Sequence, residues 1–548
     1  MILSAQKKIF TLIFILIPIF LFSQNKKAFT VRTDIPPIID GYLNDSVWNR
    51  AIPITDFYQH EPNPLYLPSE KTEVKILYDK NYLYVAFMCY DNESEKIIAR
   101  ELKLDGKWSG DDNVAIIFDT FNDDRNAYWF GTNALGMRDD AILSTGSGFN
   151  EEWHGIWDVR SAVVDSGWSC EMIFPFSTFK FSDDDKQIWG INFQRGIKRK
   201  GEVVQWTAYE KEHNFFMMSA AGDLIGMENI SRGNPIYVKP FFTAGVQTTE
   251  AVKEKYVHKP GLDIKYGITE ALSLDLTFNT DFAQVESDRA RINLTRFPLF
   301  FPEKRDFFIE GSSIFNFSIG GSNLFYSRRI GISNGEEIPI IAGTKLVGRL
   351  NKMEVGFIDM QTAAKGDEPT TNYGIARLKY DVFDQSYAGV FLSNKISKEG
   401  YNRVFAGDFV YSTNKFLGDK NLSIGTGLMK TDETNGSQNS WAGKFYIDYP
   451  NDFINQFFTY RFIQENFNPE VGFISRTGIQ TWIYNLRISP RINFYQINRL
   501  NFIPIESNID IDKNNELLAG YFTVQPFGFS TIRGDRVSIE IHREFDKV

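Results

Sequence analysis

Apolar and polar residues alternate without a break from Leu272 to Asn279, in the order Leu-Ser-Leu-Asp-Leu-Thr-Phe-Asn. Successive side chains of a β-strand point to opposite faces, so this segment predicts a strand with one apolar and one polar face. Strands that are apolar outside and polar inside are typical of outer-membrane β-barrels. The alternation recurs through the second half of the chain, at Leu422, Ile424, Thr426 and Leu428; Phe445, Ile447 and Tyr449; Trp482, Tyr484, Leu486 and Ile488; and Val537, Ile539 and Ile541.

Strand length and connections separate a barrel from a soluble sheet, which also alternates. A tilted membrane strand needs about 9–11 residues, and the segments 339–349, 403–413 and 422–430 have about that length. The connections at 365–372 and 431–440 are rich in Asn, Asp, Lys and Gly. Aromatic residues make up 15% of the chain, which suits the interfacial girdles of a barrel and also sugar-binding surfaces. These features favour a barrel over a soluble sandwich or propeller.

The first half has a different composition and predicts a separate domain. Eight of its residues are Trp, out of ten in the whole chain. Short strands separated by Gly, Asn and Asp turns, such as 74–78 and 82–90 around Asp79-Lys80-Asn81, are typical of a β-sandwich. We therefore expect an all-β protein with a jelly-roll-like sandwich at 25–232 and an antiparallel barrel domain at 233–548.

The N-terminus predicts a secretory signal peptide over residues 1–24. Lys7 and Lys8 precede an apolar run from Ile9 to Phe22, and Ser23-Gln24 forms a plausible cleavage zone. The run is too short to span a membrane comfortably. An exported protein could oxidise its two cysteines, Cys89 and Cys170, to a disulfide, but two buried thiols are the favoured interpretation.

Charge and motifs exclude several functions. The net charge of -10 argues against nucleic-acid binding, which needs clustered Lys and Arg. Two Cys and five scattered His make a zinc site improbable. The chain has no His-Glu-x-x-His or phosphate-loop motif. The 69 acidic residues still leave room for a glycosidase pair that no motif marks.

Motifs of the first half resemble the family 9 carbohydrate-binding modules and their relatives. The resemblance runs from about Val31 to Tyr209, and its most specific parts are Ile39-Asp-Gly…Trp48 and Gly167-Trp168…Glu171…Pro175-Phe176. It implies a β-sandwich that holds an oligo- or polysaccharide between aromatic rings. Trp48, Trp168 and Trp189 are expected in the core. The expected carbohydrate-binding residues are Trp108, Trp153, Trp157 and Asn133, and calcium is a possible ligand of Asp111 and Asp112.

The densest motif of the chain is a charged insertion at about 281–325. It resembles, with Tyr326–Gly331 and Phe467–Arg476, the barrel domain of a large group of Bacteroidetes outer-membrane proteins of undefined function, the DUF5916 type. Charges of both signs suggest an ion-pair network in a polar lumen or a folded-in loop, acting as a substrate gate or simply as packing. The predicted lumen or gate residues are Asp281, Glu286, Asp288, Arg296, Glu303, Arg305, Arg328 and Arg329.

These features together predict a non-enzymatic outer-membrane protein that acts in glycan binding, transport or envelope organisation, with glycan and outer-membrane lipid as partners. A glycoside hydrolase of carbohydrate catabolism and a structural partner in envelope assembly or secretion stay open as alternatives. The sandwich precedes the first strand, so we expect it in the periplasm unless it fills a very wide lumen. The sequence leaves open whether the barrel is complete at the C-terminus.

Overall fold

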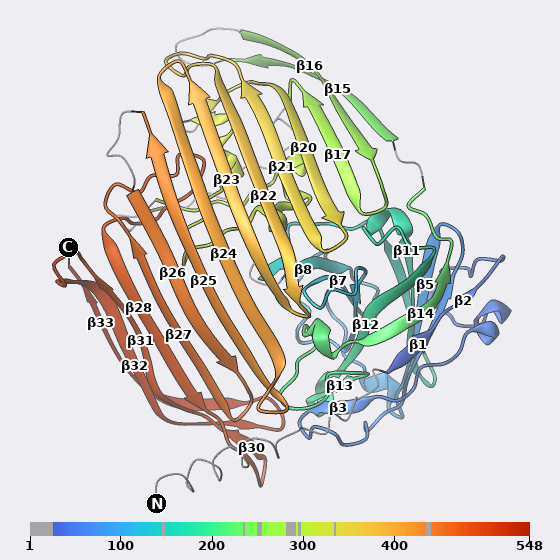
Figure 1. The fold of residues 1–548 in the computed structure, drawn as a ribbon. Helices are drawn as coiled ribbons and strands as arrows, with labels where there is room; N and C mark the ends of the chain where they lie inside the picture. Colours follow the sequence, from blue (N-terminus) through green and yellow to red (C-terminus); the bar gives the residue numbers. More distant parts are fainter. Residues whose placement is uncertain are drawn as a thin grey trace, which may run out of the picture.

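The computed structural model describes residues 26–144, 148–233, 236–248, 255–280, 292–293, 298–333, 336–434 and 440–547. The predicted signal peptide lies outside these residues. The chain forms two parts, a β-sandwich and a large curved sheet (Figure 1). Within the described residues, no helix is long and apolar enough to cross a membrane.

The sandwich consists of two sheets, as the composition of the first half predicts. The nine-stranded sheet has the order β1-β14-β12-β6-β7-β8-β9, with β13 paired to β12 and β3 paired to β13, and the five-stranded sheet has the order β10-β11-β5-β4-β2. The strands of the first sheet are β1 (Lys27–Phe29), β3 (Tyr58–Glu61), β6 (Asn113–Asp119), β7 (Asn126–Asn133), β8 (Asp139–Ser144), β9 (Gly148–Asn150), β12 (Lys186–Ile197), β13 (Glu202–Gln205) and β14 (Gly222–Glu228). Those of the second are β2 (Val31–Arg32), β4 (Thr72–Tyr78), β5 (Tyr82–Tyr90), β10 (Asp158–Val164) and β11 (Gly167–Pro175), and short 3-10 turns occur at η1 (Ser46–Arg50), η2 (Ser94–Lys96), η3 (Phe176–Thr178), η4 (Lys198–Lys200) and η5 (Met218–Ala220).

One carboxylate joins the two motifs that carried the family resemblance. Glu171 Oε1 accepts a hydrogen bond from Trp48 Nε1 (2.8 Å), and its Oε2 accepts the backbone N–H groups of Asp40 and Gly41 (2.9 Å each). Gly41 has φ +93°, and a Cβ there would lie 2.8 Å from the backbone of Ser161, so only glycine fits. The Asp-Gly turn, the buried Trp and the acidic residue therefore form one structural unit.

Aromatic and apolar side chains fill the space between the two sheets. Trp48, Trp168 and Trp189 are fully buried, which confirms their prediction as core residues. Cys89 and Cys170 are free, buried thiols on neighbouring strands β5 and β11, and burial raises the pKa of Cys89 to about 11. The disulfide alternative is therefore wrong, and both cysteines serve as small core side chains.

The large sheet holds 17 strands in antiparallel succession from β15 to β33, with β29 and β30 forming a side hairpin. β15 and β33 are the two ends of this strand order, so the sheet is open between them in the part of the chain that the structure describes. The strands are β15 (Ile236–Gln247), β16 (Lys255–Gly267), β17 (Leu272–Phe278), β20 (Ile340–Leu350), β21 (Met353–Thr362), β22 (Thr371–Phe383), β23 (Ser386–Ser397), β24 (Gly400–Phe416), β25 (Lys420–Glu433), β26 (Ser440–Pro450), β27 (Ile454–Ile463), β28 (Ile479–Ile488), β29 (Arg491–Phe494), β30 (Ile497–Leu500), β31 (Phe502–Ile511), β32 (Leu517–Thr531) and β33 (Arg536–Asp546). The sequence prediction of a membrane-type antiparallel sheet is confirmed, as an open, barrel-like arc.

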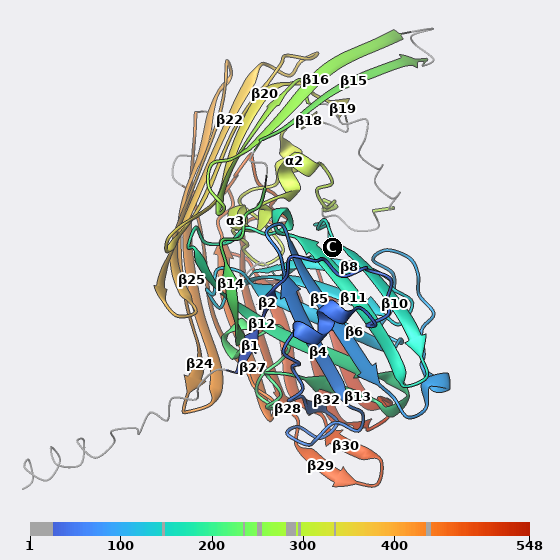
Figure 2. The ribbon, with the colours of Figure 1, turned by 90° about the vertical axis from the view of Figure 1, so that its right-hand side faces the viewer.

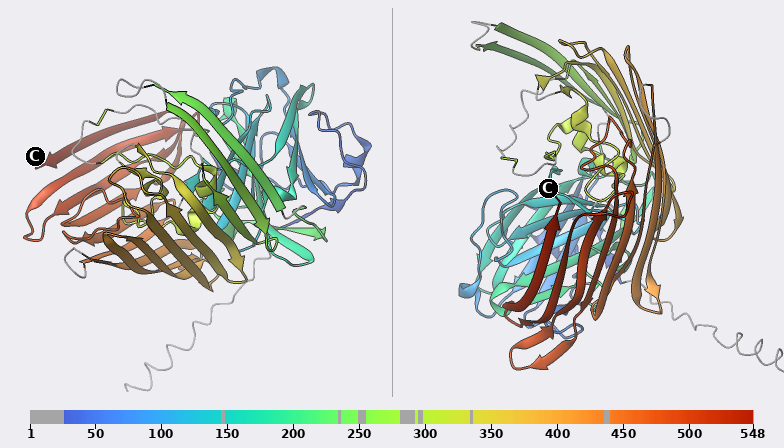
Figure 3. Two further views of the ribbon diagram at one scale, coloured as in Figure 1. Left: turned by 90° about the horizontal axis from the view of Figure 1, so that it is seen from above. Right: turned by 90° about the vertical axis from the view of Figure 1, so that its left-hand side faces the viewer.

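The two ends of the large sheet differ in their connections. Turns of two to four residues join β16 to β17, β20 to β21, β22 to β23, β24 to β25, β26 to β27 and β32 to β33 at one end, called here the short-turn end. The opposite end carries the 61 residues between Phe278 and Ile340, which include α2 (Asp306–Ile309), α3 (Ser312–Phe315), η6 (Ser327–Arg329), β18 (Ile332–Ser333) and β19 (Glu336–Glu337). This insertion folds onto the concave side of the sheet, and the sandwich lies on the same side (Figure 2). Viewed from above, the sheet forms an arc around both (Figure 3).

The two faces of the large sheet have opposite chemistry, as the alternation predicts. Inward residues such as Phe391, Val404 and Met429 are buried in a core shared with Phe315 and Phe317 of the insertion. Their outward neighbours are exposed apolar side chains, and paired registers place many of them side by side across the strands. The larger ones are Phe357, Leu378, Val390, Leu392, Phe405, Phe409, Leu428, Phe445, Ile447, Trp482, Ile509 and Phe522.

Aromatic residues mark both borders of this outward apolar band. Near the short-turn end, Phe383 contacts Tyr411 (6.1 Å between ring centroids) and Phe416 contacts Tyr449 (6.3 Å). Near the other end, the Lys430 ammonium lies 5.9 Å from the ring of Trp441. Aromatic girdles on either side of an apolar band are typical of sheets that face lipid.

Candidate functional site

A group of four aromatic side chains, two half-buried Trp and two exposed Phe, lies on the sandwich. The indoles of Trp108 and Trp129 are stacked, with centroids 5.9 Å apart and planes at 26°, and Trp129 also meets Phe149 edge to face (6.0 Å). Phe149 in turn contacts Phe216 (4.7 Å), and both Phe side chains are 42% exposed. We call these four residues the aromatic surface. Faces of this kind are where sugar rings can stack.

A glycine and a carboxylate position Trp108 within the aromatic surface. A Cβ on Gly131 of β7 would lie 2.6 Å from the Trp108 ring, so the close approach of the indole to the strand requires glycine. Trp108 Nε1 donates to Asp139 Oδ2 (2.5 Å). Burial, with the nearby carboxyls of Asp105 and Glu151, raises the pKa of Asp139 to about 6.

This raised pKa gives a pH-dependent prediction for Asp139→Asn. The native state holds a proton that the unfolded chain releases near pH 3.8, so wild-type stability falls as the pH rises from about 4 to about 6. Asn keeps an oxygen that can accept from Trp108 and carries no charge. We expect the variant to be more stable by about 1–2 kcal/mol at pH 7, after allowance for partial exposure, and by little at pH 4. Chemical unfolding of the detergent-solubilised protein at both pH values measures this, and lower stability of the variant at pH 7 would contradict it.

The predicted residue Asn133 supports the loop that carries Trp108. It is fully buried, and its Nδ2 donates to the carbonyl of Glu101 (2.8 Å) and to Asp111 Oδ2 (2.9 Å). Its Oδ1 accepts the backbone N–H groups of Leu135 (3.0 Å) and Met137 (3.2 Å). A direct sugar contact predicted from sequence does not fit this buried position, and Asn133 acts as a positioning residue.

The two carboxylates considered for calcium are also buried in hydrogen bonds. Asp111 Oδ2 accepts the N–H groups of Arg100 and Glu101 (3.0 Å each), while Asp112 accepts those of Ile98 (2.6 Å) and Lys198 (2.9 Å). Within the described ranges, no group of three or more His, Cys, Asp or Glu side chains is arranged to hold a metal ion. These carboxylates therefore serve the loop backbone in this structure.

Trp153 and Trp157 do not form the exposed surface that their Gly- and His-bearing loop suggested. Trp157 is buried and stacked on Phe174 (5.6 Å, 11°), and its Nε1 donates to Asp140 Oδ2 (2.6 Å). Trp153 is 9% exposed and packs against Phe130. This Trp-bearing loop folds inward because core aromatics and the buried carboxylate of Asp140 receive its two indoles.

Sequence analysis missed Trp129, Phe149 and Phe216 as candidates. Trp129 stands between Tyr128 and Phe130 in β7, and a run of three aromatic residues hides which of them faces outward. Phe149 and Phe216 lie 67 residues apart and meet only in the folded sandwich. Side chains alternate between the two faces of a strand, so if Phe130 of β7 faces the core, its neighbour Trp129 faces outward. This alternation was the one available signal for Trp129.

The predicted gate residues of the insertion divide into two groups. Asp281, Glu286, Asp288 and Arg296 lie outside the described residues. Arg305 is buried, and its guanidinium binds Glu303 (Nε to Oε1, 2.7 Å) and the carbonyls of Ile330 (2.7 Å) and Ser327 (2.8 Å).

Arg328 and Arg329 also bind backbone carbonyls. Arg328 Nη1 donates to Pro302 (3.1 Å) and Arg329 Nε donates to Gly472 (3.1 Å). These bonds fold the insertion onto itself and onto the connection between β27 and β28. With the shared apolar core below them, they favour the packing interpretation over a free gate.

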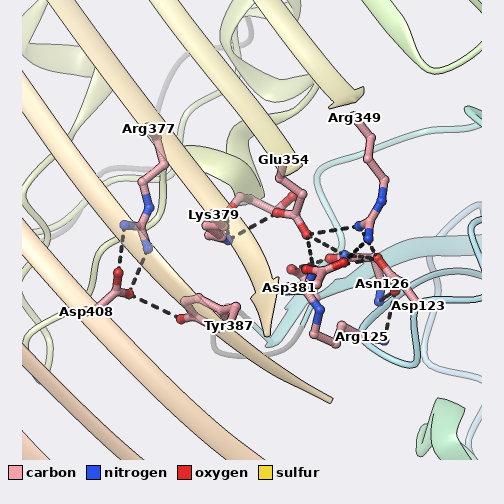
Figure 4. A network of polar contacts seen from close by, with 12 residues as sticks. Asp123, Arg125, Asn126, Arg349, Glu354, Arg377, Lys379, Asp381, Tyr387 and Asp408 are labelled. Atoms are coloured by element: carbon pink, nitrogen blue, oxygen red, sulfur yellow. Dashed lines mark hydrogen bonds and ion pairs between the residues drawn. The ribbon is translucent and has the colours of Figure 1, made fainter. Parts of the chain in front are cut away.

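A network of buried charges fastens the sandwich to the short-turn end (Figure 4). Arg125 of the sandwich binds Glu354 (2.9 Å) and Asp381, and Arg349 of the sheet binds Asp123 of the sandwich (2.6 Å). The side chains of these five residues are 3–14% exposed. Lys379 adds a third cation 3.6 Å from Glu354, so three basic groups face three acidic ones.

Further contacts reach the same end of the sheet. Glu212 binds Lys420 (3.0 Å) and the backbone N–H of Asp452 (2.9 Å), and Arg491 binds both Glu61 (3.1 Å) and Asp452 (2.9 Å). The sandwich therefore docks on a row of turns through several charged groups, and its relation to the sheet is specific.

The fold is that of an all-β protein that joins a two-sheet sandwich to a large antiparallel sheet. Residues 39–214 match the family described as carbohydrate family 9 binding domain-like, and residues 236–354 match a domain of unknown function, DUF5916. The two matches fall in the parts of the chain whose motifs carry the two resemblances, the first in the sandwich and the second at the start of the large sheet. No curated protein matches the chain.

Solved structures are similar to each part at low identity. A family 9 carbohydrate-binding module from Caldicellulosiruptor kristjanssonii, in complex with cellotriose, shares 15% identity, covering 38% of this chain and 95% of its own, with a TM-score of 0.27. OpdK from Pseudomonas aeruginosa, with vanillate, shares 9% identity, covering 79% of this chain and 93% of its own, with a TM-score of 0.26. OprD from the same organism shares 9%, covering 79% and 89%, with a TM-score of 0.28.

Proposed function

We propose that this protein is a non-enzymatic outer-membrane protein that binds a carbohydrate through its sandwich and presents it at the short-turn end of a membrane-spanning sheet. The observation that carries the proposal is the aromatic surface, which lies on the domain that matches the carbohydrate family 9 binding domain-like family. Two bonds join its surroundings to the rest of the chain, from Asn150 to Ser312 (3.2 Å) and from Asn414 to the carbonyl of Ser219 (3.4 Å). A sugar held there is next to the concave side of the sheet.

The membrane assignment rests on the outward apolar band and its aromatic borders. A contiguous exposed apolar surface of this extent is rare on a soluble protein and indicates contact with lipid. Turns at the periplasmic end of bacterial barrels are short, and longer loops face outward. The short turns support a periplasmic position for this end and for the sandwich docked on it.

This orientation predicts protection of the sandwich in intact cells. A protease added outside is expected to leave residues 26–233 intact and to cleave them only after the outer membrane is permeabilised. Immunoblotting with a sandwich-specific antibody measures the two states. Rapid loss of the sandwich in intact cells would contradict the orientation.

Sugar binding is predicted to depend on Trp129. We expect Trp129→Ala to lower affinity for a neutral glycan such as cellotriose by about tenfold to a hundredfold, because loss of an aromatic stacking face removes about 1–3 kcal/mol. Calorimetry on the full protein in detergent measures the affinity, and product analysis of the same mixture detects turnover. Val163→Ala, at an exposed site on β10, is the control variant.

The outcomes separate the candidate functions. Binding that is lost only in Trp129→Ala, with the glycan recovered unchanged, supports the proposal. Hydrolysis of the glycan would instead assign a glycoside hydrolase. Absence of binding to any glycan by the wild-type protein would assign the sandwich to protein partners in envelope assembly.

A further inference from the structure

A second cavity lies where the sandwich, the large sheet and the insertion meet. Its volume is about 230 Å³, and it is separate from the aromatic surface. The sandwich contributes Tyr128, Trp153 and Lys180, the linker and β16 contribute Arg232 and Lys265, and the insertion contributes Glu310. A space of this size is slightly below the usual range for small ligands and suits one monosaccharide unit.

The charges of this cavity are unbalanced in favour of cations. Lys180 Nζ lies 3.5 Å from Glu310 Oε1, and Lys265 binds the other oxygen of the same carboxylate. Arg232 supplies a third cation, so three positive groups face one negative group. The remaining charged residues of the wall, Arg349 and Glu354, are part of the balanced network at the domain interface. The His154 ring also lines the cavity and lies beside Asp105 and Asp140.

Two of these cations have features that indicate capacity for another anion. Arg232 Nε is buried and has no hydrogen-bond partner among the residues that the structure describes. A buried N–H without a partner costs about 1–3 kcal/mol, which an anionic ligand would recover. Lys180 Nζ donates to Ser273 Oγ (2.9 Å) and to the carbonyl of Val347 (3.3 Å), and burial, together with Arg232, Lys265 and Lys345, lowers its pKa to about 8. Its contribution toward an anion is therefore its positive charge, which an additional negative charge would stabilise.

Aromatic side chains form another part of the cavity wall. Tyr128 and Trp153 contact each other with centroids 5.3 Å apart, and Tyr128 Oη accepts the backbone N–H of Lys180 (3.0 Å). Trp153 is held in this position by Phe130 of the core (6.1 Å). A cavity lined by both aromatic and cationic side chains suits a ring that has an apolar face and carries a carboxylate.

We propose that this cavity binds a single acidic sugar unit, with its carboxylate on Arg232, Lys180 and Lys265 and its ring against Trp153. The choice of a sugar rests on the proposed function, whereas the requirement for a carboxylate rests on the charges of the cavity itself. The protein then has two carbohydrate sites of different specificity, a stacking surface for neutral rings and an enclosed site for an acidic residue. The second site is formed only when sandwich, sheet and insertion are assembled.

Calorimetric titration of the full protein in detergent with D-glucuronate, with glucose and acetate as comparison ligands, tests this site. Glucuronate is expected to bind, and glucose and acetate are expected to bind at least about tenfold more weakly, because each lacks one of the two recognised groups. Arg232→Met is expected to weaken glucuronate binding by about tenfold or more, since it removes a charge-assisted hydrogen bond. The matched control is Arg160→Met, at an exposed arginine paired with Asp158.

A second variant protects the test against a folding defect. Trp153→Leu keeps an apolar side chain and is expected to weaken glucuronate binding while leaving acetate unchanged. Equal affinity for glucuronate and glucose, absence of glucuronate binding, or unchanged binding in both Arg232→Met and Trp153→Leu would overturn the proposal. Trp129→Ala separates the two proposals: loss of cellotriose binding with retained glucuronate binding supports two sites. If no neutral glycan binds while glucuronate does, the aromatic surface fails and the cavity stands.

Discussion

Replacement of Arg125 by alanine is expected to loosen the sandwich from the large sheet and to cost about 3–5 kcal/mol in unfolding free energy. Arg125 is 3% exposed and binds Glu354 and Asp381 across the domain interface. Its removal leaves three buried carboxylates, those of Asp123, Glu354 and Asp381, facing only two cations. Uncompensated buried charge is the physical reason for so large an effect.

Two measurements test the expected loss of stability and of domain attachment in Arg125→Ala. Chemical unfolding of the detergent-solubilised protein gives the change in free energy, and limited proteolysis reports access to the linker at residues 229–233. We expect faster linker cleavage in Arg125→Ala than in wild type. Arg160→Ala, which removes an exposed arginine from the same sandwich, is the control. It should change the free energy of unfolding by no more than about 0.5 kcal/mol and should leave the rate of linker cleavage close to that of the wild type.

A double-mutant cycle with Asp381→Asn isolates the pair across the interface. If the two groups act on each other, the double variant should be less destabilised than the sum of the single variants. Strict additivity, or an Arg125→Ala protein that unfolds like Arg160→Ala, would show that the network does not hold the domains together. The remaining contacts of Glu212 and Arg491 would then be the main attachment.

Local pattern determined much of the fold in advance. The alternation at 272–279 correctly predicted β17, with Leu272 and Leu274 on one face and Ser273 and Asp275 on the other. The sandwich was predictable because its motifs are structural: Gly41, Trp48 and Glu171 are connected by direct hydrogen bonds.

The candidate sites were less predictable because they depend on long-range contacts. The prediction favoured Trp157 for its loop position, but Asp140 and Phe174 draw it into the core. Trp129, which was not singled out, became the centre of the aromatic surface because Trp108 approaches it over Gly131. Neither outcome can be read from spacing along the chain.

The position of the sandwich shows the same limit at the level of domains. Its place before the first strand predicted a periplasmic location unless it filled a wide lumen. In the structure the sandwich lies on the concave side of the sheet, as a domain inside a lumen would (Figure 2). It also docks at the short-turn end, as a domain below the sheet would. Most of the acidic and basic residues that make these contacts lie at strand ends next to the short turns, and single charges there are indistinguishable from solvated surface in a sequence.

The second large effect is expected on the outward face of the sheet. Phe445 lies on β26 four residues from Trp441 and four from Tyr449, the aromatic borders of the apolar band, and its side chain is 37% exposed. Phe445→Arg is expected to destabilise the protein in lipid bilayers by about 2–4 kcal/mol, because a charge at mid-depth must leave water or distort the bilayer. Heat-modifiable gel mobility and urea unfolding in phospholipid vesicles measure the effect.

Two matched variants decide whether lipid is the cause. Phe445→Leu keeps an apolar side chain at the same position and should cost far less than the arginine. Ile188→Arg introduces the same charge at an exposed apolar position of the sandwich, where water can solvate it, and should be nearly neutral. If Phe445→Arg and Ile188→Arg have equal effects in vesicles, the outward face does not contact lipid and the membrane assignment fails. A selective loss for Phe445→Arg would instead identify the apolar band as the membrane-facing surface, because the two positions share exposure and apolar character and differ in the solvent they meet.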